Sequence, residues 1–334
     1  MKFLPIHTDA LRSFGYTEEE ARFLYLVATH SGYFTCQQFL HFIQMKPGKR
    51  SVAFAQKVIE KKHAKTKPYL RHGRVFHLFS RNLYEAIGRE NVRFRRVHST
   101  QYIRMRLIAL DFVLRNQDVT YLETEEQKLT FFCDQMGIAK KILPHKRYSG
   151  AIKGQFTDRY FVDKFPMFLP VGATPPVATF SYVEPQAENL SAFVNHLQTY
   201  SPLFRGLEKF GFLFISSSDA LARKAREIFS ALVKGPLEQP SAMELMRYFR
   251  VRRAWENRRF AELKNEDIEF LSQATIRFKS HQCQELYRSW KNGQIAEGEA
   301  GSSIGNSNGN RQIAFETCLV KQQPFLRRTA GRTG

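Results

Sequence analysis

The chain has 334 residues, of which 43% are hydrophobic and 13% aromatic, so it is long enough to bury a core and to form more than one domain. No run of about eighteen uncharged apolar residues occurs, and the residues before Asp9 are too polar for a secretory signal, so we expect a cytoplasmic protein without a membrane segment. Its four cysteines are far apart and form no CxxC pair, which argues against a zinc ribbon or a disulfide framework.

The net charge of +20 is unevenly distributed along the chain. Residues 1–97 contain 18 Lys and Arg against 7 Asp and Glu, whereas residues 98–240 contain 17 against 14. The segment 46–79 has thirteen basic side chains, counting His, and a single carboxylate, Glu60. A solvated surface ordinarily mixes both signs, so this asymmetry favours a polyanionic partner, DNA or RNA before a membrane.

Three helices are predicted in the first 62 residues. A hydroxyl followed three residues later by a carboxylate or an amide, the pattern that caps a helix start, occurs at Thr17 and again at Thr35. Each is followed by apolar residues at helical spacing. A third helix is predicted at 51–62. Its expected inward side chains are Val52, Ala55, Val58 and Ile59.

Two short extended runs, 65–70 and 75–79, follow the third helix, with Gly73 between them for a tight turn, and a short helix at 81–88 comes next. This order predicts a winged helix-turn-helix domain over residues 1–97, with its third helix in the major groove and its hairpin on the DNA backbone or minor groove. The expected DNA-binding residues are Lys49, Arg50, Ser51, Gln56, Lys57, Lys61, Lys62, Arg71 and Arg74. Arg50, Ser51 and Gln56 are expected near base edges, and Lys57, Lys61, Lys62, Arg71 and Arg74 near phosphates. The alternative is a small basic domain that binds protein or keeps the chain soluble.

Residues 98–240 alternate between predicted helices and strands. Helices are expected at 99–115, 124–137, 187–210 and 218–234, and strands at 119–122, 160–163, 177–185 and 211–217. Two of these strands are expected to be buried and to end at carboxylates, Asp163 and Glu184. This is the order of an α/β domain of the restriction-endonuclease type.

Enzymes of that type place an Asp on one strand and Glu-x-Lys on the next, because Mg²⁺ needs oxygen ligands and the attacking water needs a nearby cation. Gln186 stands where the Lys is expected, and Lys164 is the other candidate cation. Two interpretations remain open. Asp163 and Glu184 are either the Mg²⁺ ligands of a nuclease or ordinary polar residues that close two strands, and in the second case no cofactor is expected.

Residues 241–292 are predicted to be helical and basic, and contain the run RYFRVRRAWENRRF. This run either lies along a phosphate backbone or packs through its aromatic side chains while its arginines pair with acids. Residues 293–310 are rich in Gly, Ser, Asn and Glu, which predicts a linker, and we expect 293–334 to be a flexible tail. The motifs GxxxxGK[ST], GxGxxG, HExxH and GxSxG are absent from the chain.

The order of these features resembles the replication-relaxation family of plasmids and integrative elements. The resemblance spans roughly residues 10–235 and includes LYEAIG, the helix HSTQYIRMRLIALDFVLR, and the segments FVDKF, FSYVEP and FLFISSS. It implies a DNA-binding protein of a bacterial mobile element, acting in replication or transfer, whose nuclease-like half is often poor in catalytic residues. The implied partners are double-stranded DNA and a second copy or replication and transfer proteins.

Asp163 and Glu184 match the acid positions of the family, while Gln186 departs from it, which argues against cleavage but not against binding. A winged-helix transcriptional regulator is the remaining alternative.

Overall fold

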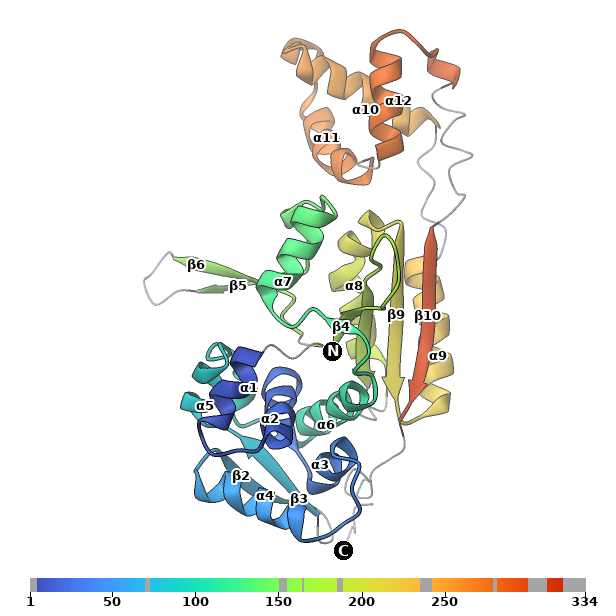
Figure 1. Cartoon of the computed structure of the whole chain (residues 1–334). Coiled ribbons are helices and arrows are strands. Elements are labelled where there is room, and N and C mark those ends of the chain that lie inside the picture. The colour runs from blue at the N-terminus through green and yellow to red at the C-terminus, as the bar shows by residue number, and fades with distance from the viewer. Residues whose placement is uncertain are drawn as a thin grey trace, which may run out of the picture.

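The computed structural model describes residues 5–69, 73–149, 155–163, 165–184, 189–234, 242–278, 281–299 and 311–320. Figure 1 shows an N-terminal group of helices with a small sheet, a larger sheet flanked by helices, and a separate group of helices above that sheet. The protein is therefore a mixed α and β protein, as expected at this level. Within the described ranges, no helix combines the length and the apolar character needed to cross a bilayer.

The N-terminal part alternates helices with a three-stranded sheet. Its elements are α1 (Pro5–Arg12), α2 (Glu18–His30), β1 (Tyr33–Phe34), α3 (Cys36–Phe42), α4 (Lys49–Glu60), β2 (Ala64–Tyr69), β3 (Gly73–Leu78) and α5 (Arg81–Ala86). Both predicted caps form, because the Thr17 and Thr35 side chains each accept a hydrogen bond from the N–H three residues on, and the Glu20 and Gln38 side chains accept one from the N–H of Thr17 and Thr35. The hairpin of β2 and β3 is confirmed. The strand β1, which the sequence patterns did not reveal, pairs with β3 and gives the order β1-β3-β2.

Helix α6 (Thr100–Arg115) lies between the N-terminal helices and the larger sheet (Figure 1). It follows the 3₁₀ turn η1 (Arg93–Arg95), and Ser99 caps it as predicted. The Gln38 side-chain amide of α3 donates to both the Asp111 carboxylate and the Leu107 carbonyl at 2.9 Å. Apolar side chains of α6 share one core with α2 and with Val183 of β8 (Thr179–Glu184). The hydrophobic core therefore continues across residues 97 and 98, where the first domain is predicted to end.

The larger sheet has five strands in the order β10-β9-β8-β7-β4. Its other strands are β4 (Thr120–Tyr121), β7 (Met167–Leu169), β9 (Lys209–Ser216) and β10 (Gln312–Leu319). The strands β8, β9 and β10 are parallel neighbours, whereas β7 is antiparallel to both β8 and β4. Alternate residues of a strand face opposite sides. Phe212 and Phe214 accordingly belong to the core on one face of the sheet, and Leu213 and Ile215 belong to the core on the other face, which they share with α6.

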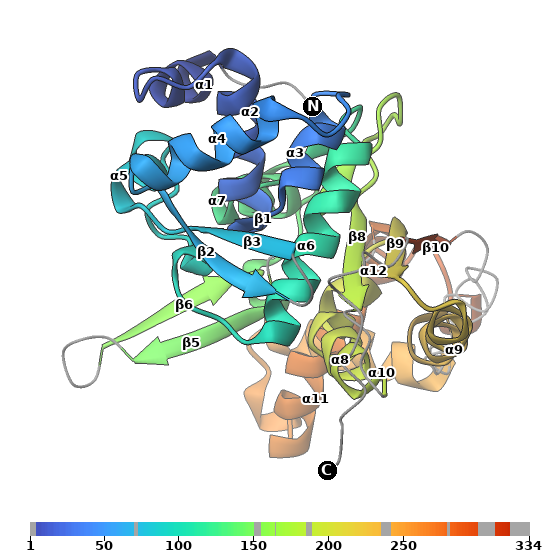
Figure 2. The same ribbon diagram turned by 90° about the horizontal axis from the view of Figure 1, so that it is seen from below.

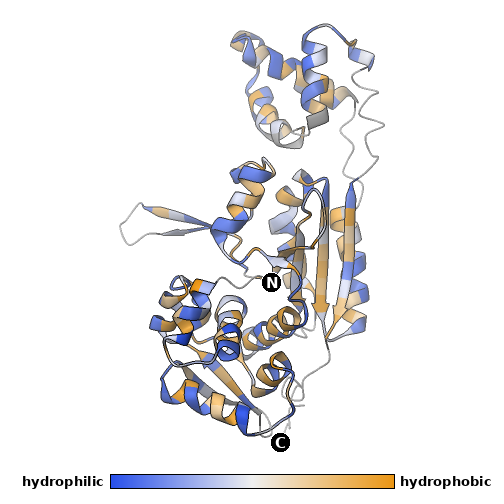
Figure 3. Cartoon of the chain, in the orientation of Figure 1, coloured by the Kyte–Doolittle hydropathy of each residue, from blue (hydrophilic) through white to orange (hydrophobic). Residues whose placement is uncertain are grey.

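Two helices cover the face of the sheet opposite α6. They are α8 (Ser191–Gly206) and α9 (Asp219–Phe229), and α9 continues as the π-helical turn η4 (Ser230–Lys234). Figure 3 shows β9 as largely hydrophobic and the outer side of α9 as hydrophilic, which is the pattern of a helix packed on a buried strand. The predicted helix over 187–210 is shorter than expected because β9 already begins at Lys209.

The prediction that residues 293–334 form a flexible tail is wrong for residues 312–319, which form the edge strand β10. Phe315 is 6% exposed and contacts the rings of Phe212 and Phe229 on the α9 side of the sheet. The Arg311 guanidinium donates to the carbonyl of Phe204 at 2.5 Å and so anchors the start of the strand. The strand has only eight residues and follows a Gly-, Ser- and Asn-rich segment, so the composition of the region as a whole predicted a linker and a tail.

The predicted buried strand at 160–163 is also wrong. Tyr160 ends β6 (Phe156–Tyr160), which pairs with β5 (His145–Ser149) in a hairpin that projects from the body (Figure 2). Phe161 has a φ of 51°, a backbone conformation that ends a strand, and its ring turns into the core against Phe132. Asp163 consequently lies in the turn before β7. The helix predicted at 124–137 is divided into α7 (Glu125–Leu129) and the π-helical turn η2 (Thr130–Gln135), and the 3₁₀ turn η3 (Lys140–Ile142) follows.

A buried ionic cluster joins α2 to the segment before α7. The Glu123 carboxylate, 9% exposed, lies 2.6 Å from the Arg89 guanidinium and accepts a hydrogen bond from the Tyr25 hydroxyl at 2.5 Å. Burial favours the neutral acid, but the hydrogen bonds and charges of His30, Tyr25 and Arg89 outweigh it and lower the pKa of Glu123 to about 2. Glu123 therefore stays ionised and ties the two parts of the chain together.

The C-terminal helices form a unit with its own small core. They are α10 (Ala242–Glu256), the 3₁₀ turn η5 (Phe260–Glu262), α11 (Asn265–Arg277) and α12 (His281–Lys291). Tyr248 and Phe249 are buried in this core, and Arg252 and Lys291 both pair with Glu256, at 2.9 and 2.7 Å. These contacts agree with the packing interpretation of the basic run in α10 rather than with a helix laid along phosphates.

Candidate nucleic-acid interface

The orientation of α4 is set by aromatic packing. Phe54 is fully buried, and its ring lies 4.1 Å from that of Phe39 and 5.7 Å from that of Phe34 (centroid distances). The buried positions of the helix are Ser51, Phe54, Ala55 and Val58, the spacing of one helical face. The expectation that Val52 and Ile59 face inward is wrong, since their side chains are 56% and 39% exposed. A helix turns its largest apolar side chain to the core, and here that is Phe54.

This orientation decides which of the predicted DNA-binding residues can reach a ligand. Lys49, Gln56, Lys61 and Lys62 are exposed on or just beyond α4. Ser51 is 5% exposed and donates to the Gly48 carbonyl, so its predicted place near a base edge is wrong. Its position next to the buried aromatic face accounts for this, because the helical spacing that buries Phe54, Ala55 and Val58 also buries position 51.

Two further basic residues of α4 form ion pairs with the first turn of α2. Arg50, which is exposed, pairs with Glu19, and the Lys57 amine lies 2.7 Å from the Glu20 carboxylate. Lys57 is 30% exposed, and its ion pair with Glu20 holds α4 against α2 and partly neutralises its charge. Through these two ion pairs, the acidic first turn of α2 helps to position the basic helix α4.

The hairpin beside α4 is fixed to the helices through β1. Tyr33 and Phe34 of β1 pair with His77 and Phe76 of β3, so the hairpin cannot swing independently of the helical core. Arg74 is exposed at the start of β3, as predicted for a backbone contact, whereas Arg71 lies outside the described residues. The Lys65 amine lies 5.3 Å from the centre of the Phe79 ring. An exposed helix face and a basic hairpin are thus held in one rigid frame.

The acids predicted to bind Mg²⁺ occupy two different environments. Glu184 is the last residue of β8, as predicted, and is 1% exposed. The Asp163 carboxylate lies 2.8 Å from His196 Nδ1 of α8, and its pKa is lowered because hydrogen bonds from His196 and Tyr200 and the charges of His196 and Lys146 outweigh its burial. Lys164 and Gln186 lie outside the described residues.

His196 and Tyr200 were missed by sequence reasoning, although their i, i+4 spacing on a helix was a usable signal. Both are buried. Burial, and then the charge and hydrogen bond of Asp163, raise the pKa of the Tyr200 hydroxyl. The group is an acid that is hydrogen-bonded to a histidine and a tyrosine of α8. Over the described ranges, no three His, Cys, Asp or Glu side chains are grouped so as to hold a metal ion.

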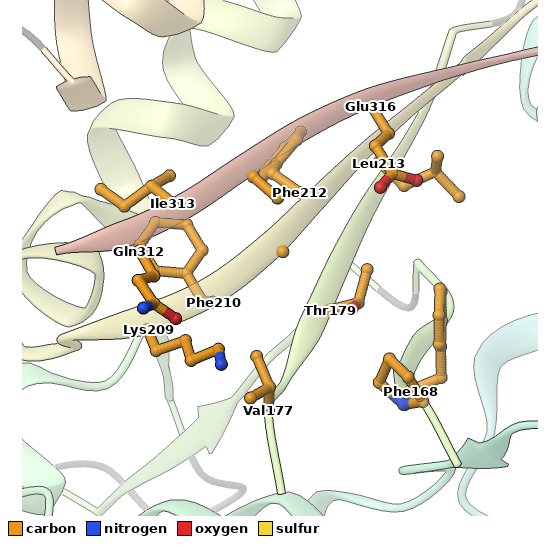
Figure 4. Close-up of a pocket in the computed structure, with 13 residues that line it drawn as sticks. Phe168, Val177, Thr179, Lys209, Phe210, Phe212, Leu213, Gln312, Ile313 and Glu316 are labelled. Atoms are coloured by element: carbon orange, nitrogen blue, oxygen red, sulfur yellow. The ribbon is translucent and has the colours of Figure 1, made fainter. Parts of the chain in front are cut away.

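A pocket of about 460 Å³ opens on the sheet face that α6 covers only in part (Figure 4). It lies where β8, β9 and β10 begin, and Figure 4 shows Phe168, Thr179 and Leu213 around it with Lys209 and Glu316 at its margins. The lining is mainly apolar, which favours the packing of a hydrophobic group over acid–base chemistry. No sequence pattern pointed to this pocket, because one of its walls is β10.

Comparison with known proteins finds no matching family model, no matching curated protein and no matching solved structure. The resemblance to the replication-relaxation family therefore stays an expectation based on the layout of the chain. The functional interpretation depends on the chemistry of the exposed residues alone.

Proposed function

We propose that the protein binds duplex DNA through residues 1–97, with α4 as the recognition helix and the hairpin of β2 and β3 as the wing of a winged helix-turn-helix domain. The observation that carries the proposal is the exposed face of α4, which presents Lys49 and Gln56 on the side opposite the buried Phe54, while Lys61 and Lys62 are exposed just past the end of the helix. An amide beside several amines combines a group that reads base edges with groups that hold phosphates.

The exposed apolar residues of α4 support the same proposal. Val52 and Gln56 are one helical turn apart on the solvent side, and the apolar side chain of Val52 is 56% exposed there. Aliphatic side chains on a recognition helix contact the thymine methyl group in the major groove. The anchoring of the hairpin by β1 gives it the fixed position relative to α4 that a wing requires.

The second half of the chain supports a binding role better than catalysis. Its order of helix, strand, helix, two strands, helix and strand, from α6 through β9 with the hairpin of β5 and β6 inserted after α7, is compatible with a nuclease-like domain. Asp163, however, is engaged by His196, and its place in a turn differs from the strand end that a metal ligand needs. We extend the proposal to a role in replication or transfer of a bacterial mobile element, or in its regulation, on the strength of the sequence resemblance.

The test is duplex binding measured by fluorescence anisotropy at several salt concentrations between 50 and 200 mM, with fragments of the source replicon and with random duplex. Each phosphate contact contributes about 0.9 to the slope of log affinity against log salt. The variant Lys49→Gln, Lys61→Gln, Lys62→Gln is therefore expected to reduce the slope by up to about 2.7. The control Arg205→Gln, Lys224→Gln changes exposed residues of α8 and α9. An unchanged slope in the triple variant would refute the assignment of α4.

A further inference from the structure

The hairpin of β5 and β6 projects from the body of the molecule. Both views show it leaving the body as a two-stranded ribbon (Figures 1 and 2). No described residue of either strand is buried, and Phe156 is 61% exposed. A two-stranded ribbon with both faces in water is marginally stable by itself. Its side chains therefore need an explanation other than packing.

The two faces of the ribbon differ in charge. On one face Arg147 makes a bidentate ion pair with Asp158, at 2.9 and 3.1 Å, and His145 lies opposite Tyr160. On the other face Lys146 lies directly opposite Arg159 in the strand register. Like charges placed opposite each other destabilise an antiparallel pair. One face is thus neutralised within the hairpin, and the other is not.

A third cation joins the Lys146 face from the N-terminal part of the chain. The Arg93 guanidinium of η1 lies 4.7 Å from the centre of the Tyr148 ring, and Tyr148 shares this face with Lys146 and Arg159. Two carboxylates approach: Glu125 lies 3.7 Å from Arg159, while Asp163, which feels the charge of Lys146, is already bonded to His196. This face therefore carries three cations, Lys146, Arg159 and Arg93, against two nearby carboxylates.

We propose that the hairpin of β5 and β6 is a second DNA-contacting arm, whose Lys146 and Arg159 face lies on a phosphate backbone. This inference rests on the proposed function, because it assumes the same ligand. The phosphates relieve the repulsion across the strands, and the guanidinium of Arg159 matches a phosphate in bidentate geometry. A narrow two-stranded ribbon also fits a groove of the duplex.

The experiment compares Lys146→Gln, Arg159→Gln with wild type in the anisotropy assay described above. Loss of two phosphate contacts reduces the salt slope by about 1.8, so the fall in affinity between 50 and 200 mM salt becomes about 12-fold smaller than in wild type. The matched control is Arg147→Gln, Asp158→Asn, which alters the same hairpin on its neutralised face without changing net charge and is expected to keep the wild-type slope. Circular dichroism checks that both variants are folded.

The outcomes separate this inference from the proposed function. A reduced slope in the Lys146 and Arg159 variant alone supports the arm. A wild-type slope in that variant, together with a reduced slope in the α4 triple variant, overturns the arm and leaves the winged helix in place. An equal loss in both hairpin variants means that the shape of the hairpin matters rather than this charged face, and overturns the inference as well. Absence of duplex binding by the wild-type protein overturns both proposals.

Discussion

Replacing Glu123 by Gln tests the joint between the N-terminal helices and the segment that leads to α7. The substitution keeps the size of the side chain and removes its charge, leaving Arg89, whose side chain is 11% exposed, without its anionic partner. The pKa of Glu123 falls from 4.5 to about 2 on folding. A shift of this size corresponds to about 3 kcal/mol of stability at pH 7. Because burial lowers the pKa of His30, its charge is absent at pH 7 and Arg89 and Tyr25 supply the stabilisation there, so we expect Glu123→Gln to lose between about 1 and 3 kcal/mol.

The pH dependence distinguishes this cause from simple loss of packing. Because the pKa is lower in the folded protein, the stabilisation is fully present above pH 4.5 and is lost as the pH falls towards 2. The difference in unfolding free energy between wild type and Glu123→Gln should therefore shrink to less than half by about pH 3. Urea titrations followed by circular dichroism at pH 7, 5, 4 and 3 measure it.

The control for this series is Glu126→Gln, which removes an exposed carboxylate from α7 and is expected to change stability by no more than about 0.5 kcal/mol. A difference between wild type and Glu123→Gln that stays constant from pH 7 to pH 3 would refute the electrostatic reasoning and assign the loss to packing.

Five other substitutions, two of them controls, probe the fold and the acid site. Phe54→Ala should cost about 3 to 5 kcal/mol in thermal unfolding, whereas Val52→Ala on the exposed side should stay within about 0.5 kcal/mol. Gly32→Ala places a Cβ 2.6 Å from a neighbouring side-chain carbon at a φ of 78° and should cost about 2 kcal/mol or more, while Gly137→Ala, with a similar φ and open space, should cost about 1 kcal/mol. Asp163→Ala should leave any Mg²⁺-dependent nicking of supercoiled plasmid unchanged while lowering the melting temperature, and selective loss of nicking would instead favour the nuclease.

Local patterns predicted much of the N-terminal half. The caps at Thr17 and Thr35 depend on residues three positions apart, and the hairpin of β2 and β3 depends on a short turn, so neighbouring residues carry the information. The face of α4 was predicted less well, because several rotations of that helix bury apolar residues. The ring of Phe54 selects one of them through contacts with α3 and β1, which no local pattern contains.

The candidate acid site depended on contacts between distant residues and was predicted only in part. Glu184 ends its strand as expected, but the partners of Asp163 lie 33 and 37 residues further along, on a helix that passes over the sheet. The hairpin of β5 and β6 and the strand β10 escaped detection for the same reason. Each is defined by its pairing partner rather than by an apolar pattern of its own.

The position of β10 has a consequence for how the chain assembles. Helices α10 to α12 lie between α9 and β10 in sequence, yet β10 is the neighbour of β9 in the sheet. The helical unit is therefore nested inside a β-α-β crossover. During synthesis, the ring of Phe229 on α9 has no Phe315 to cover it until β10 emerges, after the nested helices have been made. The sheet is thus closed by a strand that is synthesised after the nested helices, so these helices must form without blocking the free edge of β9.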